Sequence, residues 1–261
     1  MILFTGHGDI AESFSQKYNC EIVSMRNKTL GDMEKLLTSF NVVIHNAANL
    51  HPTSIEQATE DNFVLTKRIL DTLYKVNPEA KFIYLSSMSF LKTYDEYLNP
   101  LEMTPYAFSK YLGEIYTLHH THFNAVSVRF STVFYRSPVK DGLSKLIYEA
   151  TTKKHVSIIN NAEAERDFLP LDILVQYLYK ISQDIKNKRS YTLCSGRSTS
   201  FAQIIGWIKS VIKELKTENS FVNQSAFVMH EFSTESIDAL GKIEFELIDF
   251  VIDYAKALQQ A

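Results

Sequence analysis

Residues 2–11 read Ile-Leu-Phe-Thr-Gly-His-Gly-Asp-Ile-Ala, a short apolar run followed by a G-x-G-x-x-A pattern. The apolar run predicts a buried strand, and the pattern after it predicts the opening of a helix. Glycines let the backbone turn sharply and approach a pyrophosphate, while a helix N-terminus supplies amide donors. We expect a dinucleotide site here, with contacts from Gly6, His7, Gly8, Asp9 and Ile10; a purely structural turn is the alternative.

Short apolar runs alternate with amphipathic stretches along the first half of the chain. Strands are expected near residues 2–4, 21–23, 41–44, 81–85 and 125–128. Helices are expected near residues 9–18, 30–39, 57–75, 105–120 and 170–184, where apolar residues recur at three and four. Such alternation predicts an α/β fold of βα units around a parallel sheet.

The pattern loosens beyond about residue 135. It predicts helices near 141–153, 201–214 and 235–258, and strands at 155–159 and 191–193. We interpret residues 1–135, with returning segments near 166–195, as a dinucleotide-binding domain. Residues 136–261 then form a smaller, interleaved C-terminal substrate lobe, because no Pro/Gly/Ser linker separates the two parts.

Composition narrows the classes of function. The chain has 261 residues, 45% hydrophobic and 22% charged, with a formal net charge of -3, which indicates a globular protein without a nucleic-acid surface. Cys20 and Cys194 are far apart in the sequence and form no paired-cysteine motif. This fits free thiols in a reducing compartment better than a disulfide framework. No apolar stretch reaches the roughly 18 residues of a membrane span and no signal sequence opens the chain, so a cytoplasmic location is expected.

The second expected strand lacks the acidic residue that commonly binds the adenosine ribose of NAD. It continues as Ile22-Val23-Ser24-Met25-Arg26-Asn27-Lys28. Arg26 is able to accept a 2′-phosphate through charge-assisted hydrogen bonds, which favours NADP over NAD. The alternative is a solvated basic loop.

Tyr106 and Lys110 stand four residues apart and so share one face of an expected helix. A tyrosine near pKa 10 is a poor base at pH 7, but a nearby cation stabilises its phenolate. We therefore predict a proton-transfer pair, although this spacing also arises by chance in helices.

Hydroxyl and small side chains follow two other expected strands. Ser87 comes after the strand 81–85, at the carboxyl end where open α/β sheets bind ligands, and is suited to donate to a substrate carbonyl. A hydroxyl-rich turn is the alternative. After the strand 41–44, Asn46, Ala47 and Ala48 leave room for a cofactor, and Asn62 follows in the next helix.

With these motifs in order, the chain resembles the extended short-chain dehydrogenase/reductase family, which includes sugar-nucleotide epimerases, dehydratases and reductases. The resemblance covers nearly the whole chain and rests on residues 5–11, 43–48, 85–87, 106–114, 128–130 and 166–172. It implies a Rossmann-type doubly wound parallel sheet.

The resemblance also implies roles for single residues. Ser87 would polarise the sugar carbonyl or hydroxyl, Tyr106 would transfer the proton, and Lys110 would tune Tyr106 and hold the ribose. Val133 would lie along the nicotinamide, and Ser89, Thr132 and Arg166 would contact the substrate, Arg166 at its diphosphate. A homodimer is implied, with Tyr111, Ile115 and Leu118 against the partner.

Departures from the family pattern refine this reading. The glycine loop is one residue shorter than usual, and the segment 21–44 has room for one helix only, so the sheet is expected to be reduced. Dehydratases carry an Asp-Glu pair where this chain has Met88 and Ser89, which disfavours dehydration.

We consider three functions, in order of preference. We expect reduction of a keto (4-keto) sugar nucleotide first and epimerisation through a transient keto intermediate second. The alternative of another class is a catalytically silent dinucleotide sensor. No metal is expected, because His119, His120 and His122 are better read as a helix C-terminal cap.

Overall fold

The computed structural model describes residues 1–92, 96–120, 124–184, 188–222 and 232–260. The chain forms two compact units. Unit 1 contains Met1–Phe130 and Val175–Leu193, and unit 2 contains Ser131–Leu174 and Cys194–Ala261. The first division thus falls at Phe130, a few residues before the change of pattern near residue 135.

Unit 1 is built on a six-stranded sheet in which every pair of neighbouring strands is parallel. Its order is β2-β1-β3-β4-β5-β9. The strands are β1 (Ile2–Phe4), β2 (Glu21–Ile22), β3 (Val42–His45), β4 (Lys81–Leu85), β5 (Ala125–Phe130) and β9 (Ser190–Leu193). The predicted α/β class and its parallel sheet are confirmed.

The strand order reverses direction at β1, which lies between β2 and β3. After β1 the chain first adds β2 on one side of β1 and then β3 on the other side. This change of direction creates a switch point beyond the carboxyl ends of β1 and β3. Both the glycine turn and the Asn46–Ala48 segment begin there. A Cβ added to Gly6 would lie 2.9 Å from the Cβ of Ala47, so glycine is required for this close approach.

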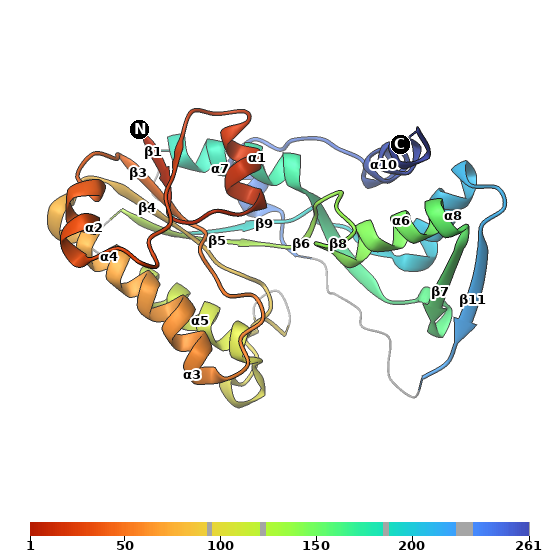
Figure 1. Cartoon of the computed structure of the whole chain (residues 1–261), viewed down its shortest axis with the longest axis horizontal. Coiled ribbons are helices and arrows are strands. Elements are labelled where there is room, and N and C mark those ends of the chain that lie inside the picture. The colour runs from red at the N-terminus through yellow and green to blue at the C-terminus, as the bar shows by residue number, and fades with distance from the viewer. Residues whose placement is uncertain (93–95, 121–123, 185–187, 223–231, 261) are drawn as a thin grey trace. The chain divides into compact units, whose positions relative to one another are not determined.

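Helices cover both faces of this sheet, as a doubly wound fold requires (Figure 1). On one face are α1 (Asp9–Ser15) and α7 (Leu171–Gln183), joined by stacking of Tyr18 on Tyr179 with ring centroids 3.9 Å apart. The other face carries α2 (Leu30–Leu37), α4 (Leu65–Val76) and α5 (Pro105–His119). A single helix, α2, joins β2 to β3, as the sequence predicted for this segment.

The helix expected at 57–75 contains an irregularity that its periodicity did not indicate. It begins as α3 (Ile55–Ala58), widens into a π-turn, η1 (Thr59–Val64), and continues as α4. A π-turn holds one extra residue per turn and often occurs at functional sites. Here it turns Asn62 into the interior, where the side chain is buried.

Unit 2 holds two small sheets. In the first, the middle strand β8 (Glu165–Pro170) pairs parallel with β6 (Thr132–Phe134) and antiparallel with β10 (Ser198–Ser200). The second pairs β7 (His155–Ile159) with β11 (Lys216–Ser220). Of the strands in these two sheets, the sequence predicted only β7, at residues 155–159.

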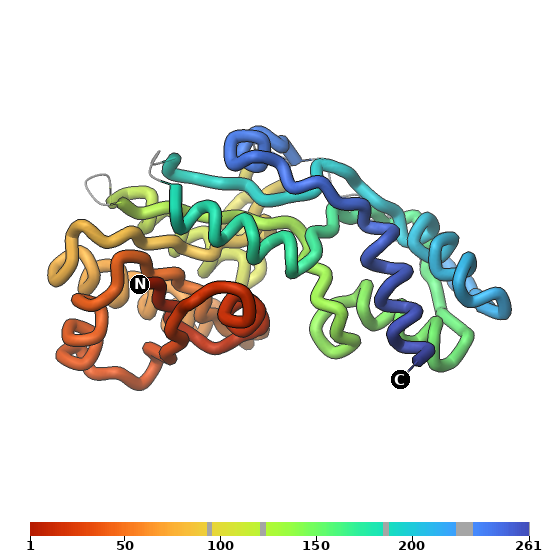
Figure 2. Tube along the Cα trace, turned by 90° about the horizontal axis from the view of Figure 1, so that it is seen from above, coloured from red at the N-terminus to blue at the C-terminus, as the bar shows by residue number. Residues whose placement is uncertain are grey.

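The helices of unit 2 pack as a layer of three. In Figure 2, α10 (Leu247–Gln260) lies between α6 (Gly142–Lys153) and α8 (Phe201–Val211). The single helix predicted at 235–258 is wrong, because α9 (Glu235–Ala239) ends before Gly241, whose φ of 78° is left-handed. The described residues also include the short 3₁₀ turns η2 (Pro100–Glu102) in unit 1 and η3 (Asn160–Ala162) in unit 2.

Within the described part of the chain, every helix is too short or too polar to cross a bilayer.

Helix α5 packs closely on the unit 1 sheet at Gly113. A Cβ at this position would lie 2.3 Å from the hydroxyl oxygen of Tyr84 and 2.6 Å from its Cζ. Tyr84 is fully buried on β4 and its ring has no space to move into. Gly113 therefore fixes how near α5 lies to β4.

Gly113→Ala is expected to destabilise the protein by roughly 1 to 3 kcal/mol through overpacking, although alanine is the better helix former. Gly206→Ala is the matched control, because Gly206 also lies inside a helix and nothing stands within 4 Å of its added Cβ. That change is expected to stabilise by up to about 1 kcal/mol. Urea denaturation measures both, and equal effects of the two changes would refute the close packing.

Candidate active site

Helix α5 begins with strong local signals that fix where its first turn starts. The Thr104 hydroxyl accepts a hydrogen bond from the Ala107 amide at 3.2 Å, and Pro105 occupies the first helical position. Tyr106 and Lys110 follow one turn apart on the same face of this helix. Tyr106 and Lys110 therefore lie in one helix, as their spacing predicted. The cap at Thr104 fixes where that helix begins.

Lys110 is buried, with 3% of its surface exposed. Its ammonium donates to the carbonyl oxygen of Leu85, the last residue of β4, and lies 4.2 Å from the ring centroid of Tyr84. Burial lowers the pKa of Lys110 to about 7, and the carboxylate of Glu114 opposes part of that shift. The lysine thus changes charge near neutral pH.

Tyr106 faces the predicted catalytic serine. Burial raises the pKa of the Tyr106 phenol, and a hydrogen bond with Ser87 lowers it in part. The Ser87 hydroxyl donates to the Ser89 hydroxyl at 2.9 Å and accepts from the Ser89 amide at 3.0 Å. Tyr106 is therefore paired with Ser87, while Lys110 reaches Leu85, two residues before Ser87, and at neutral pH the Tyr106 phenol keeps its proton.

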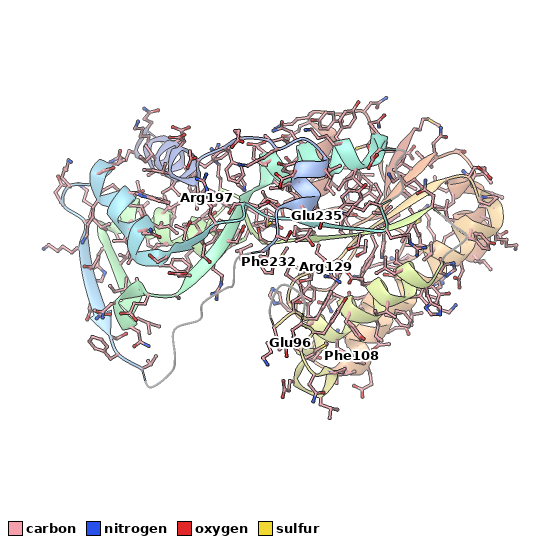
Figure 3. The ribbon with its side chains drawn as sticks, turned by 180° about the vertical axis from the view of Figure 1, so that it is seen from behind. Glu96, Phe108, Arg129, Arg197, Phe232 and Glu235 are labelled. Atoms are coloured by element: carbon pink, nitrogen blue, oxygen red, sulfur yellow. The ribbon has the colours of Figure 1, made fainter. Side chains whose placement is uncertain are left out.

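A buried ion pair supports the same helix from behind. Glu114 is fully buried on α5 and receives hydrogen bonds from Arg129 Nε at 2.9 and 3.0 Å and from the Ser127 hydroxyl at 2.7 Å. Arg129, at the end of β5 in Figure 3, also donates to the Tyr97 hydroxyl at 2.6 Å. Glu114 and Arg129 belong to the family motifs seen in the sequence, but the sequence did not indicate that they form an ion pair.

Asn62, predicted as a cofactor contact, has both ends of its amide engaged within unit 1. Its Nδ2 donates to the Asn49 carbonyl at 3.1 Å and to the Ser109 hydroxyl at 2.9 Å, and its Oδ1 accepts from the Asn49 amide at 2.6 Å. Ser109 in turn donates to the Tyr106 carbonyl. The π-turn is thereby tied to the helix that carries the proton-transfer pair.

His45 links this network to the glycine turn, a role that the sequence did not reveal. The Thr66 hydroxyl donates to the Asn62 carbonyl at 2.6 Å, so it accepts from His45 Nε2 at 2.9 Å. His45 Nδ1 then accepts from the Thr5 hydroxyl at 2.6 Å. Burial, with Lys110 and Arg26 nearby, lowers the pKa of His45 to about 3, so the imidazole stays neutral.

The residues at the switch point fit a dinucleotide. Gly8 is the N-cap of α1 and leaves the first amides of that helix without a side-chain cap. The Oδ1 atom of Asn46 is buried without a hydrogen-bond partner. The Nδ2 atom of the same side chain lies 3.8 Å from the position that a Cβ on Gly8 would occupy. An uncapped helix start and an unpaired amide oxygen together suit a ligand with phosphates and hydroxyls.

Arg26 is engaged in an ion pair rather than standing alone in a basic loop. Its Nη1 lies 3.0 Å from Asp61 Oδ1, and the other carboxylate oxygen accepts from Asn49 Nδ2 at 2.8 Å. Asp61 belongs to the π-turn and was not selected from the sequence, because it follows Arg26 by 35 residues.

The predicted substrate residues Thr132 and Arg166 lie in unit 2. Thr132 pairs with Phe168 across β6 and β8, and Arg166 precedes Phe168 by two residues, so both point to the same face of that sheet. Val133 is buried and points to the other face. Burial lowers the pKa of the Arg166 guanidinium, which donates to the Glu165 carbonyl at 2.9 Å.

The histidines near the end of α5 do not form a metal site in the described residues, where no three His, Cys, Asp or Glu side chains gather. His120 lies 3.6 Å from Asp71. His122 lies outside the described residues.

Comparison with known proteins agrees with this geometry. The model of the NAD-dependent epimerase/dehydratase family matches residues 8–194, which is more than half of the chain. The chain therefore belongs to the NAD-dependent epimerase/dehydratase family. No curated protein sequence matches it.

Solved structures share the whole fold at low sequence identity. ADP-L-glycero-D-manno-heptose-6-epimerase of Helicobacter pylori is 16% identical, with 100% of this chain and 96% of that chain covered and a TM-score of 0.80. RMD of Pseudomonas aeruginosa, complexed with NADPH, is 15% identical over 99% and 97%, with a TM-score of 0.79. MoeE5 in complex with UDP-glucuronic acid and NAD is 16% identical over 98% of each chain, with a TM-score of 0.76.

We expect the burial of Lys110 to make stability depend on pH. Its pKa falls from 10.5 to about 7 on folding, so between these values the unfolded chain binds more protons and the unfolding free energy rises with pH. Lys110→Met is expected to remove up to roughly 3 kcal/mol of that rise between pH 7 and 9. Urea titrations at pH 6 to 9 measure the difference in slope, and parallel curves for the two proteins would contradict the burial of a titrating ammonium.

Proposed function

We propose that this protein is a nicotinamide-dependent oxidoreductase that acts on a nucleotide-linked sugar, and that it reduces a keto group, most simply at C4. The observation that carries the proposal is that Tyr106 is bonded to Ser87 and that Lys110, on the same helix, reaches Leu85 at the carboxyl end of β4. A silent dinucleotide sensor needs none of these three groups, so their assembly favours catalysis.

Each of the three side chains has a defined part in the proposed reaction. Bound nicotinamide dinucleotide supplies or accepts the hydride. The Ser87 hydroxyl holds the sugar oxygen, and the Tyr106 phenol, protonated at neutral pH, donates its proton to that oxygen as the alcohol forms. Protonated Lys110 then stabilises the phenolate until a proton returns.

Features within unit 2 suit a nucleotide-linked substrate. Arg166 and Thr132 share one sheet face, and a guanidinium is well matched to a diphosphate. A cavity of about 290 Å³ in the same unit is lined by apolar side chains including Leu146, Ile158 and Phe201, with Lys145 among its polar groups. Its volume is near the lower limit of ligand pockets and is suited to a flat base.

Dehydration is disfavoured, because neither of the two residues directly after Ser87 carries a carboxylate. Met88 is buried and Ser89 is bonded to Ser87. Water elimination across two carbons needs an acid and a base there, and neither side chain supplies one.

Epimerisation through a transient keto intermediate is the second candidate, and the Arg26–Asp61 ion pair favours it. An epimerase keeps its cofactor through the cycle and suits NAD, whereas a reductase exchanges NADPH. Arg26 alone favours NADP, and its carboxylate partner weakens that preference. Mass spectrometry of ligands released from the purified protein separates the candidates: retained NAD supports the epimerase, and exchange of added NADPH supports the reductase.

A cytoplasmic homodimer stays a prediction. The α5 face that would meet a partner includes Ile115, which is exposed, and Tyr111 and Leu118, which are half-buried.

We expect Tyr106→Phe to lower kcat on nucleotide-linked keto sugars by about 10²- to 10⁴-fold, because it removes the proton donor and keeps the ring. Dinucleotide affinity is expected to change little. Tyr111→Phe is the matched control, since it removes a phenol from the same helix away from Ser87. Steady-state kinetics with a panel of such sugars gives kcat, and calorimetry gives the affinity.

Full turnover by Tyr106→Phe would overturn the proton-transfer role. Binding of the dinucleotide without turnover of any nucleotide-linked sugar by the wild type would overturn the proposed substrate class.

A further inference from the structure

The end of β2 is where an open α/β sheet of this order meets the adenosine ribose of a dinucleotide. Backbone pairing with β1 continues past Ile22, since the Val23 amide donates to Phe4 and the Met25 amide donates to Thr5. Arg26 is therefore the first side chain beyond the last paired residue. The segment from Ile22 to Lys28 contains no carboxylate of its own.

A carboxylate nevertheless reaches this position from another element. Asp61, on the π-turn, lies 3.0 Å from Arg26, and Asn49 holds its second oxygen at 2.8 Å. Asn49 itself is fixed by two hydrogen bonds with the buried Asn62. The carboxylate is thus held in place by Asn49, while 28% of the Asp61 side chain and 38% of the Arg26 side chain remain exposed to solvent.

The adenosine riboses of NAD and NADP differ at the 2′ position, and they interact with the Arg26–Asp61 pair in opposite ways. A 2′-hydroxyl donates a hydrogen bond, which a carboxylate accepts. A 2′-phosphate is an anion: it is repelled by Asp61 and must compete with it for Arg26. Because an ion pair this exposed contributes little to stability, cofactor choice depends mainly on whether Asp61 accepts a hydrogen bond from the 2′-hydroxyl or repels the 2′-phosphate.

We propose that Asp61 is the residue that sets cofactor choice in this protein, by supplying from the π-turn the carboxylate that β2 lacks and by holding Arg26 away from a 2′-phosphate. The chain then prefers NAD to NADP, which reverses the preference that Arg26 alone indicates and, of the two proposed reactions, favours epimerisation over reduction. This assignment rests on the proposed use of a nicotinamide dinucleotide.

The test is isothermal titration of NAD and NADP into the whole protein and four variants. Asp61→Asn keeps the shape and an oxygen acceptor for Asn49 but removes the charge. Glu60→Gln removes the same charge one residue away on the exposed side of the turn and serves as the matched control. Arg26→Gln and the double variant Asp61→Asn/Arg26→Gln show whether any gain in NADP affinity depends on the guanidinium.

The wild type and Glu60→Gln are expected to bind NAD at least about tenfold more tightly than NADP. In Asp61→Asn the ratio is expected to shift toward NADP by about tenfold or more, mainly through tighter NADP binding to the freed Arg26. The double variant is expected to lose that gain. Thermal unfolding of each variant shows that the comparison is made on folded protein.

Two results would overturn the assignment while leaving the proposed function intact: wild-type protein that binds NADP as tightly as NAD, or an unchanged ratio in folded Asp61→Asn. If the folded wild type binds neither dinucleotide, the proposed function fails, and the role of Asp61 fails with it.

Discussion

The position of the Lys110 ammonium, buried between the Leu85 carbonyl and the Tyr84 ring, is the constraint on which the candidate site depends. A charge in that environment is tolerated only where hydrogen bonding and a nearby carboxylate offset its desolvation. Gly113 allows the approach by leaving space for the Tyr84 hydroxyl, and Glu114 supplies the negative charge. Packing, charge and the reach of Lys110 are therefore set by five consecutive residues of α5, little more than one helical turn.

A second set of contacts connects this helix to the glycine turn. Thr5, His45, Thr66 and Asn62 form a chain of buried hydrogen bonds from the end of β1 to the π-turn, and Ser109 continues it to the Tyr106 carbonyl. Because buried polar groups are costly when unpaired, each member constrains its neighbours. The place where a cofactor would bind and the place where a proton would move thus belong to one rigid assembly within unit 1.

Local patterns predicted the parts of this assembly that depend on short spacings. The turn at Gly6 and Gly8 follows from a strand and a helix adjacent in sequence, and the pairing of Tyr106 with Lys110 follows from helical periodicity. Ser87 could be placed because parallel strands end at one edge. The family resemblance and the fold class were predictable for the same reason.

Contacts between distant segments could not be predicted in this way. Asp61 meets Arg26 across 35 residues, and only the extra residue of the π-turn directs it there. The strands β6, β8 and β10 have no alternating apolar pattern to mark them, since β6 and β10 have three residues each and β8 begins with the charged residues Glu165, Arg166 and Asp167. The break between α9 and α10 depends on the left-handed backbone of Gly241, which periodicity does not register.

The most direct test of the account is a single-turnover measurement of reduced nicotinamide absorbance, with dinucleotide-loaded wild-type protein and Lys110→Met mixed with nucleotide-linked sugars and their keto forms. The account predicts that the absorbance of the wild type falls with a keto sugar, or rises transiently with a hydroxyl sugar, and that both changes are much slower in Lys110→Met. An absorbance that stays constant for every such sugar in the wild type, or an equal rate in Lys110→Met, would contradict it.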